Sequence, residues 1–154
     1  MHLSRGSGLL EIVIGAAIIG TAIVALLASF TAYFRYALLY EKNLQVAYLI
    51  EEGFEVMSFL RDADWEVNIA AHSPDIFFLE WTGTEWAITD TANYIDNLFL
   101  RSVFISNVYR NVSGKISESG TDDPYTKKIT VDVSYANGST AVVKSVSTYI
   151  TKLE

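Results

Sequence analysis

GLLEIVIGAAIIGTAIVALLASFTAYF, residues 8–34, is a long apolar stretch that contains one charged side chain, Glu11. Residues 12–34 carry no charge and, as a helix rising 1.5 Å per residue, would extend about 35 Å. The hydrocarbon core of a bilayer is about 30 Å thick. A cleaved secretory signal would have a shorter apolar core and no acid within it. We therefore expect residues 8–34 to form a membrane-spanning helix.

The helical pattern continues beyond the apolar stretch. Apolar side chains recur at Ala47, Ile50, Phe54 and Met57, which is the spacing of one face of an amphipathic helix. Leu49, Val56 and Leu60 widen that face. No proline interrupts residues 9–65. The sequence therefore predicts one continuous helix of roughly 80 Å, with its first half in the membrane.

After residue 74 the pattern changes from helical to alternating. A hairpin is expected around Gly83, and Asn137-Gly138 is a strong signal for a second hairpin turn. The segments with strand character are residues 76–82, 86–89, 98–109, 129–135 and 141–150. We expect an α+β fold in which the long N-terminal helix packs on a C-terminal antiparallel sheet of about four strands.

Glu11 is the residue of the apolar stretch that most needs a partner. A carboxylate within hydrocarbon costs roughly 2.5 to 3.5 kcal/mol on insertion scales, so an intramembrane acid indicates function. If the chain is cut between Gly6 and Ser7, the new α-amine lies four residues before Glu11 and is a suitable cation, from the same chain or from a neighbour. Alternatively, Glu11 lies at the level of the lipid headgroups and reaches water.

Residues 5–20, RGSGLLEIVIGAAIIG, resemble the N-terminus of type IV pilins and pseudopilins. Proteins of that family have a short basic leader that ends in glycine, a processing site for prepilin peptidase and a glutamate as the fifth mature residue. Gly6, Ser7 and Glu11 match these three features. The family usually has phenylalanine where this chain has Ser7, and many major pilins have proline where it has Ala28. These departures favour a minor pilin or pseudopilin.

The resemblance implies the processing and the partners of the chain. Prepilin peptidase would cut after Gly6, Ser7 would be N-methylated, and Glu11 would act in assembly with other pilin subunits on an inner-membrane assembly platform. The precursor would cross the cytoplasmic membrane once with its C-terminal head outside, and would join an extracellular filament of a type IV pilus, a type II secretion system or a competence apparatus. The expected domains are a leader (1–6), a transmembrane and filament-core helix (7–35), an amphipathic continuation (36–66) and a pilin-like sheet head (67–154).

A different class of function fits the same sequence. The chain would then be a permanently membrane-anchored binding module that captures a ligand outside the cell and never polymerises.

Trp81 and Trp86 flank the Gly83 turn. Their side chains would form either a sugar-stacking platform or a cross-strand pair in the core or at an interface.

The polar stretch 111–125 is expected to be a loop, and long loops on rigid sheets often bind ligands. Asp122 and Asp123 are candidate Ca²⁺ ligands there, although their spacing matches no complete calcium loop and Asp-Asp-Pro is also common in turns.

Enzymatic and nucleic-acid functions find little support in the sequence. Outside the expected leader the only histidine is His72, the chain has no cysteine, and it contains no hydrolase or metalloprotease motif. We therefore expect no enzyme activity and no cofactor.

A net charge of −7 opposes direct binding to nucleic acid. Such binding would need a local basic patch, for which the candidates are Arg101, Arg110, Lys127, Lys128 and Lys144.

Overall fold

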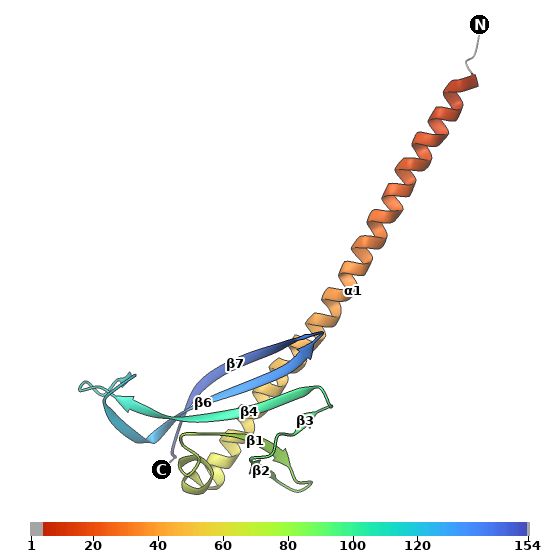
Figure 1. The fold of residues 1–154 in the computed structure, drawn as a ribbon. Helices are drawn as coiled ribbons and strands as arrows, with labels where there is room; N and C mark the ends of the chain where they lie inside the picture. The colour runs from red at the N-terminus through yellow and green to blue at the C-terminus, as the bar shows by residue number, and fades with distance from the viewer. Residues whose placement is uncertain (1–4, 154) are drawn as a thin grey trace. The chain divides into compact units, whose positions relative to one another are not determined.

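The computed structural model describes residues 5–153, with side chains described from residue 8 onward. The chain divides into two compact units, residues 1–43 and 44–154, which we call the first unit and the second unit. Helix α1, Arg5–Ala63, contributes residues to both units (Figure 1). Its 59 residues confirm that the helical pattern continues without interruption beyond the apolar stretch.

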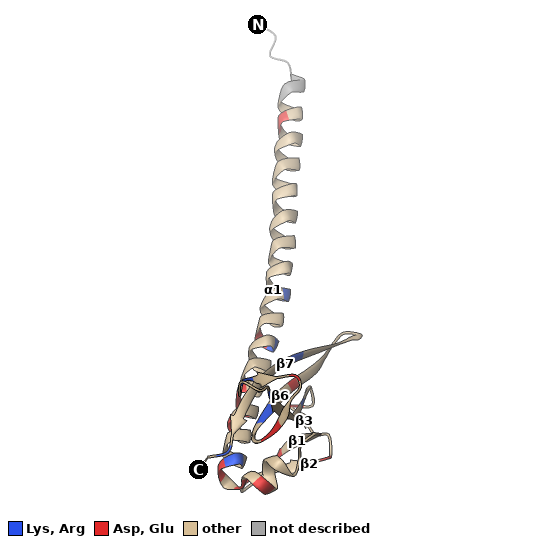
Figure 2. Cartoon of the chain, turned by 90° about the vertical axis from the view of Figure 1, so that its left-hand side faces the viewer, with Lys and Arg blue, Asp and Glu red and all other residues tan. Residues whose placement is uncertain are grey.

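The first unit consists of the apolar half of α1. Its large apolar side chains are exposed throughout residues 9–40, with Leu9 71% exposed and Phe30 61% exposed. Helix α1 contains a segment with a mean hydropathy of 2.5, and by length and composition it is apolar enough to cross a membrane. Figure 2 shows how sparse charged residues are along this part of the helix and how they gather in the second unit.

In the second unit the remaining turns of α1 pack on the sheet. The buried side chains of this part of the helix are those of Val46, Ile50, Val56, Met57 and Leu60, with Gly53 buried among them. Of the face predicted from the sequence, Ile50, Val56, Met57 and Leu60 are buried, Leu49 and Phe54 are half-buried against the core, and Ala47 is exposed. The predicted face is therefore largely the one that packs on the sheet.

The sheet has seven strands, not the four or so that the sequence predicts. All the pairings are antiparallel, and the main path runs β2-β1-β4-β6-β7, with β3 and β5 paired to β4. The strands are β1 (Asp75–Trp81), β2 (Trp86–Thr89), β3 (Tyr94–Ile95), β4 (Phe99–Arg110), β5 (Ile116–Ser117), β6 (Thr121–Asn137) and β7 (Thr140–Thr151).

Some of the extra strand residues lie in the stretch that was expected to be a loop. Only residues 111–115 and 118–120 of that stretch lie outside strands, because β5 and the start of β6 occupy the rest. The prediction of one loop over 111–125 is therefore wrong in part. The first residues of β6 pair with the end of β4, beyond a register shift between Asn107 and Val108. These residues of β6 carry polar side chains on both faces of the strand.

The core lies between α1 and the inner face of β4 and β6. Val103 and Ile105 of β4, and Ile129, Val131 and Val133 of β6, are fully buried. They alternate with less buried residues, as expected for strands with one covered face.

Gly53 allows α1 to approach β6 closely. A Cβ atom added at Gly53 would lie 2.9 Å from Cγ1 of Val131, which is closer than real side chains come. The absence of a side chain at Gly53 therefore permits this close approach between helix and sheet.

Helix α1 ends at Ala63, slightly before the predicted boundary at residue 66, and a π-helical turn follows at Glu66–Ala70. Trp65 and Ile69 are buried in the core at this end. The side chain of Asn68 donates a hydrogen bond of 2.9 Å to the carbonyl oxygen of Leu60, which satisfies one acceptor of the last helical turn.

Candidate functional site

Glu11 lies on α1 in the first unit, within the apolar segment. Its side chain is exposed, and within residues 8–153 it has no hydrogen-bond or ion-pair partner. A carboxylate placed in a bilayer in this condition costs roughly 2.5 to 3.5 kcal/mol. The geometry therefore leaves Glu11 available to a cation from outside the described residues.

The processing site predicted between Gly6 and Ser7 falls at the edge of the described chain. The backbone of both residues belongs to α1, but their side chains, together with residues 1–4 of the predicted leader, lie outside the described part. Cleavage after Gly6 and methylation of Ser7 stay predictions.

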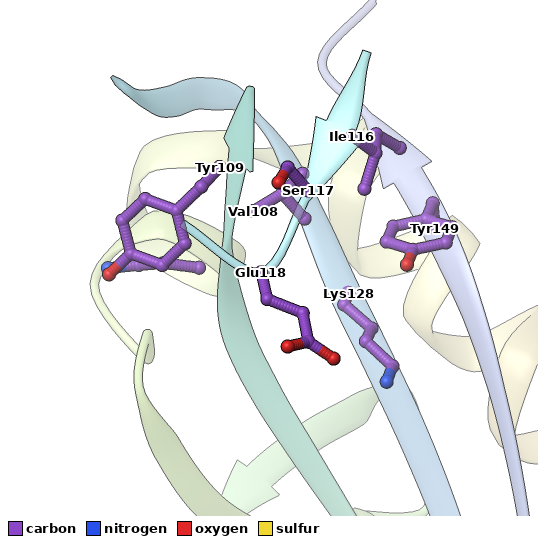
Figure 3. A pocket seen from close by; sticks show the side chains of 8 residues that line it. Val108, Tyr109, Ile116, Ser117, Glu118, Lys128 and Tyr149 are labelled. Carbon is purple, nitrogen blue, oxygen red and sulfur yellow. The ribbon is translucent and has the colours of Figure 1, made fainter. Parts of the chain in front are cut away.

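A hollow of about 450 Å³ lies near the predicted loop, between the ends of β4, β5, β6 and β7 (Figure 3). Its walls include Tyr109, Ile116, Glu118, Lys128 and Tyr149. In Figure 3 the side chains of Glu118, which follows β5, and of Lys128 on β6 extend in the same direction. Among the described residues, no polar side-chain atom of this hollow is buried without a hydrogen-bond partner. The hollow therefore shows no donor or acceptor that awaits a ligand.

Asp123, one of the two candidate Ca²⁺ ligands, is engaged by Arg110. Nε of Arg110 donates to Oδ2 of Asp123 at 2.6 Å, and the amide of Tyr125 donates to Oδ1 at 3.0 Å. Asp122 is exposed and, as the next residue in a strand, projects to the opposite face. Among the described residues no three acidic or histidine side chains gather as a metal site would require. The two aspartates are thus not brought together, and calcium binding by them stays a prediction.

The contacts of Asp123 lower its pKa. Burial acts to raise the pKa, but the hydrogen bonds from Arg110, Thr126 and the amide of Tyr125, with the positive charge of Arg110, outweigh burial. Arg110 also donates from Nη1 to the carbonyl oxygen of Gly114 at 2.9 Å. The ion pair therefore fastens the 111–115 turn to β6.

We expect Asp123→Asn to lower the stability of the second unit at pH 7 and to matter less in acid. Because folding lowers the pKa of Asp123, its contribution is full above the unfolded value of about 3.9 and is lost as the pH falls through the folded value. Urea unfolding of both proteins at pH 7, 4 and 2.5 measures the effect. Asp122→Asn is the matched control, and an equal effect of the two substitutions at pH 7 would contradict the prediction.

The candidate basic patch is divided by the fold. Arg101 and Lys127 are buried, and Nζ of Lys127 donates to Oδ1 of Asn107 at 2.8 Å. Arg110 is paired with Asp123. These three cations are therefore occupied in holding the second unit together.

Sequence reasoning missed the internal role of Arg101. Its guanidinium donates from Nη1 to Glu52 of α1 and to the carbonyl oxygen of Leu49, and it lies 5.4 Å from the ring centroid of Trp86. Glu52 and Arg101 are far apart in the chain, and neither belongs to a motif. Only the docking of α1 on β4 brings them together.

Comparison of the chain with protein-family models, with curated proteins and with solved structures found no match. The resemblance to pilins and pseudopilins thus rests on residues 5–20 and on the order of elements, a long apolar helix followed by an antiparallel sheet.

Proposed function

We propose that the protein is a minor pilin or pseudopilin, a structural subunit that enters a filament through its N-terminal helix. The observation that carries the proposal is the carboxylate of Glu11, which has no partner within residues 8–153 and lies near the start of an apolar helix. Held in hydrocarbon without a partner, this carboxylate would only disfavour the insertion of a simple membrane anchor.

The exposed surface of the first unit supports assembly. Its large apolar side chains, from Leu9 to Phe34, need lipid or neighbouring helices to cover them. In the precursor the cytoplasmic membrane covers them, and in the filament the same helices of other pilin subunits replace the lipid. Single-pass insertion with the sheet head outside is the orientation that this transfer requires.

Glu11 has a specific task in the proposed assembly. After prepilin peptidase cuts behind Gly6, the amine of Ser7 in one subunit neutralises Glu11 of a neighbour. An α-amine has a pKa of about 7.7 to 8, so it is largely charged near neutral pH, and N-methylation keeps that charge. The pairing removes the cost of the carboxylate and sets the register between subunits as they leave the assembly platform.

Processing by prepilin peptidase tests the proposal directly. When the full chain is produced together with the peptidase in a bacterial membrane, we expect the intact mass to fall by that of residues 1–6 and Ser7 to become the first residue. One additional methyl group would report N-methylation. The matched control is Gly6→Leu, which should stay uncut.

Two results would overturn the proposed processing. A wild-type chain that still begins at Met1 would be uncut, and this result would favour a permanently membrane-anchored protein. A cut near residue 30 would remove the membrane segment and make the chain a secreted protein.

A further inference from the structure

A second hollow, of about 280 Å³, lies in the second unit beside the β1–β2 hairpin. Its polar and aromatic lining comes from α1, from both strands of the hairpin, from the segment before β3 and from β4, and consists of Glu52, Glu80, Trp81, Trp86, Asn93 and Arg101. Five separate parts of the fold therefore converge on one small space.

The two tryptophans form one wall of this hollow. Trp81 and Trp86 are direct partners across the β1–β2 pair, and their rings meet edge to face with centroids 5.6 Å apart. Trp86 is half-buried, while Trp81 is 53% exposed. Arg101 lies over Trp86 and holds that ring in place, so Trp81 presents a supported aromatic surface to solvent.

The guanidinium of Arg101 supplies donors that the protein itself does not use. Its side chain is 2% exposed, and both of its hydrogen bonds, to Leu49 and to Glu52, start from Nη1. Nε is buried without an acceptor among the described residues, and no acceptor within them takes a hydrogen bond from Nη2. Guanidinium groups have five N–H donors, so Arg101 retains donors beyond the bonds that it makes within the protein. A ligand acceptor that reaches one of them would satisfy a donor that the described residues leave unused.

Charge and size limit the class of ligand. The carboxylate of Glu52 and the guanidinium of Arg101 are paired at the hollow, so their charges cancel and the hollow favours neither an anion nor a cation. The side chain of Glu52 is 44% exposed and uses only Oε2 for Arg101, which leaves Oε1 as an acceptor. Pockets for drug-sized ligands measure about 300 to 1,000 Å³, and this hollow is slightly smaller. It suits one small, neutral molecule that both donates and accepts hydrogen bonds.

We propose that this hollow binds a neutral pyranose sugar. The apolar C–H face of the sugar ring stacks on Trp81, a hydroxyl group donates to Glu52, and Asn93 and Arg101 donate to the sugar oxygens. The proposal requires no filament and stands independently of the proposed function. The sugar is either free or the terminal residue of a glycan, since both present the same ring to the site.

The test is a titration of the full chain in micelles of a detergent without a sugar headgroup, because alkyl glycosides would compete. Glucose, galactose, mannose and N-acetylglucosamine, each also as its methyl glycoside, are followed by Trp fluorescence and by saturation-transfer NMR. We expect saturable binding of at least one sugar, weakened roughly two- to tenfold by Trp81→Ala, since the substitution removes the aromatic face on which the sugar stacks. Trp81→Phe should retain part of the affinity.

Controls separate the site from the fold. Trp81 is exposed, so Trp81→Ala should unfold at nearly the wild-type temperature, and Asn93→Ala gives a second variant that weakens binding. Tyr149→Ala removes an exposed aromatic ring that lines the other hollow and should leave the affinity unchanged. A preference for the methyl glycoside would support a glycan end, and equal binding of the reducing sugar would support a free sugar.

Three results would overturn the assignment. The first is that none of the sugars binds saturably, and the second is that sugar binding persists unchanged in both Trp81→Ala and Asn93→Ala. The third is saturable binding of N-acetyl-lysine amide in the absence of sugar binding, which would assign the hollow to a cationic side chain of a partner.

Discussion

Glu11→Ala is expected to reduce incorporation of the chain into filaments about 100-fold while leaving membrane insertion intact. The substitution removes the group that attracts the amine of the neighbouring Ser7, and an attraction equal to the roughly 3 kcal/mol cost of a bare carboxylate corresponds to about that factor. Insertion should not suffer, because alanine is easier to place in lipid than glutamate. Filaments sheared from cells and the membrane fraction, both probed for the chain, measure the two effects.

Two matched variants make the Glu11 result specific. Glu11→Gln keeps the shape and removes the charge, so it should fail in assembly almost as severely. Ser29→Ala changes another polar side chain of the same helix, one whose hydroxyl donates to the carbonyl oxygen of Ala25, and should assemble normally. Normal incorporation of Glu11→Ala would contradict the filament proposal. A permanently anchored binding module would show no dependence on Glu11 at all.

The helix could be predicted from the sequence because its signals are local. An apolar run without proline, followed by apolar residues at helical spacing, predicts a helix that ends at residue 66, close to the observed end of α1 at Ala63. The centre of β6 and the β6–β7 turn were equally accessible, because residues 129–135 alternate strictly and Asn137-Gly138 favours a tight turn, in which Gly138 has a φ of 64°.

The segments predicted at 76–82, 86–89, 98–109 and 141–150 correspond to β1, β2, β4 and β7. Strands β3 and β5 and the start of β6 could not be predicted, because their signals are not local. Strands β3 and β5 have two residues each, too few to show any period. The start of β6 has polar residues on both faces and is a strand only because it pairs with the end of β4. Residues at the start of β6 form a strand because they pair with the end of β4, and a bulge in the pairing sets which residues meet. The sequence of one segment alone carries no information about that pairing.

The candidate sites also divide into those that a local sequence signal reveals and those that only the folded arrangement of strands and helix brings together. Glu11 is visible from the sequence because an acid in an apolar run is anomalous by itself. The Trp81–Trp86 pair follows from the hairpin turn, but its meeting with Arg101 depends on the order β2-β1-β4 and on the docking of α1. Sequence reasoning thus found one wall of the second hollow and missed the buried donor that gives the hollow its chemistry.

Glu52→Ala is expected to lower the free energy of unfolding of the second unit by about 3 kcal/mol. Glu52 is the only acidic side chain that bonds Arg101 among the described residues, and without it a guanidinium that is 2% exposed keeps one carbonyl acceptor. Removing one partner of a buried ion pair typically costs about 3 to 5 kcal/mol, and the partial exposure of Glu52 places the effect at the lower end. Urea unfolding in micelles, followed by Trp fluorescence, measures it.

Asp62→Ala is the matched control, because it breaks the more exposed pair between Arg61 and Asp62 of the same helix and should cost under about 1 kcal/mol. Equal losses in the two variants would contradict a special role for Glu52. The double variant Glu52→Ala/Arg101→Met removes both charges and should regain most of the lost stability, since apolar replacement of a buried pair is often neutral. Recovery would mean that the close packing of Gly53 on Val131 holds α1 to the sheet, and that the buried charge is retained for the chemistry of the hollow rather than for stability.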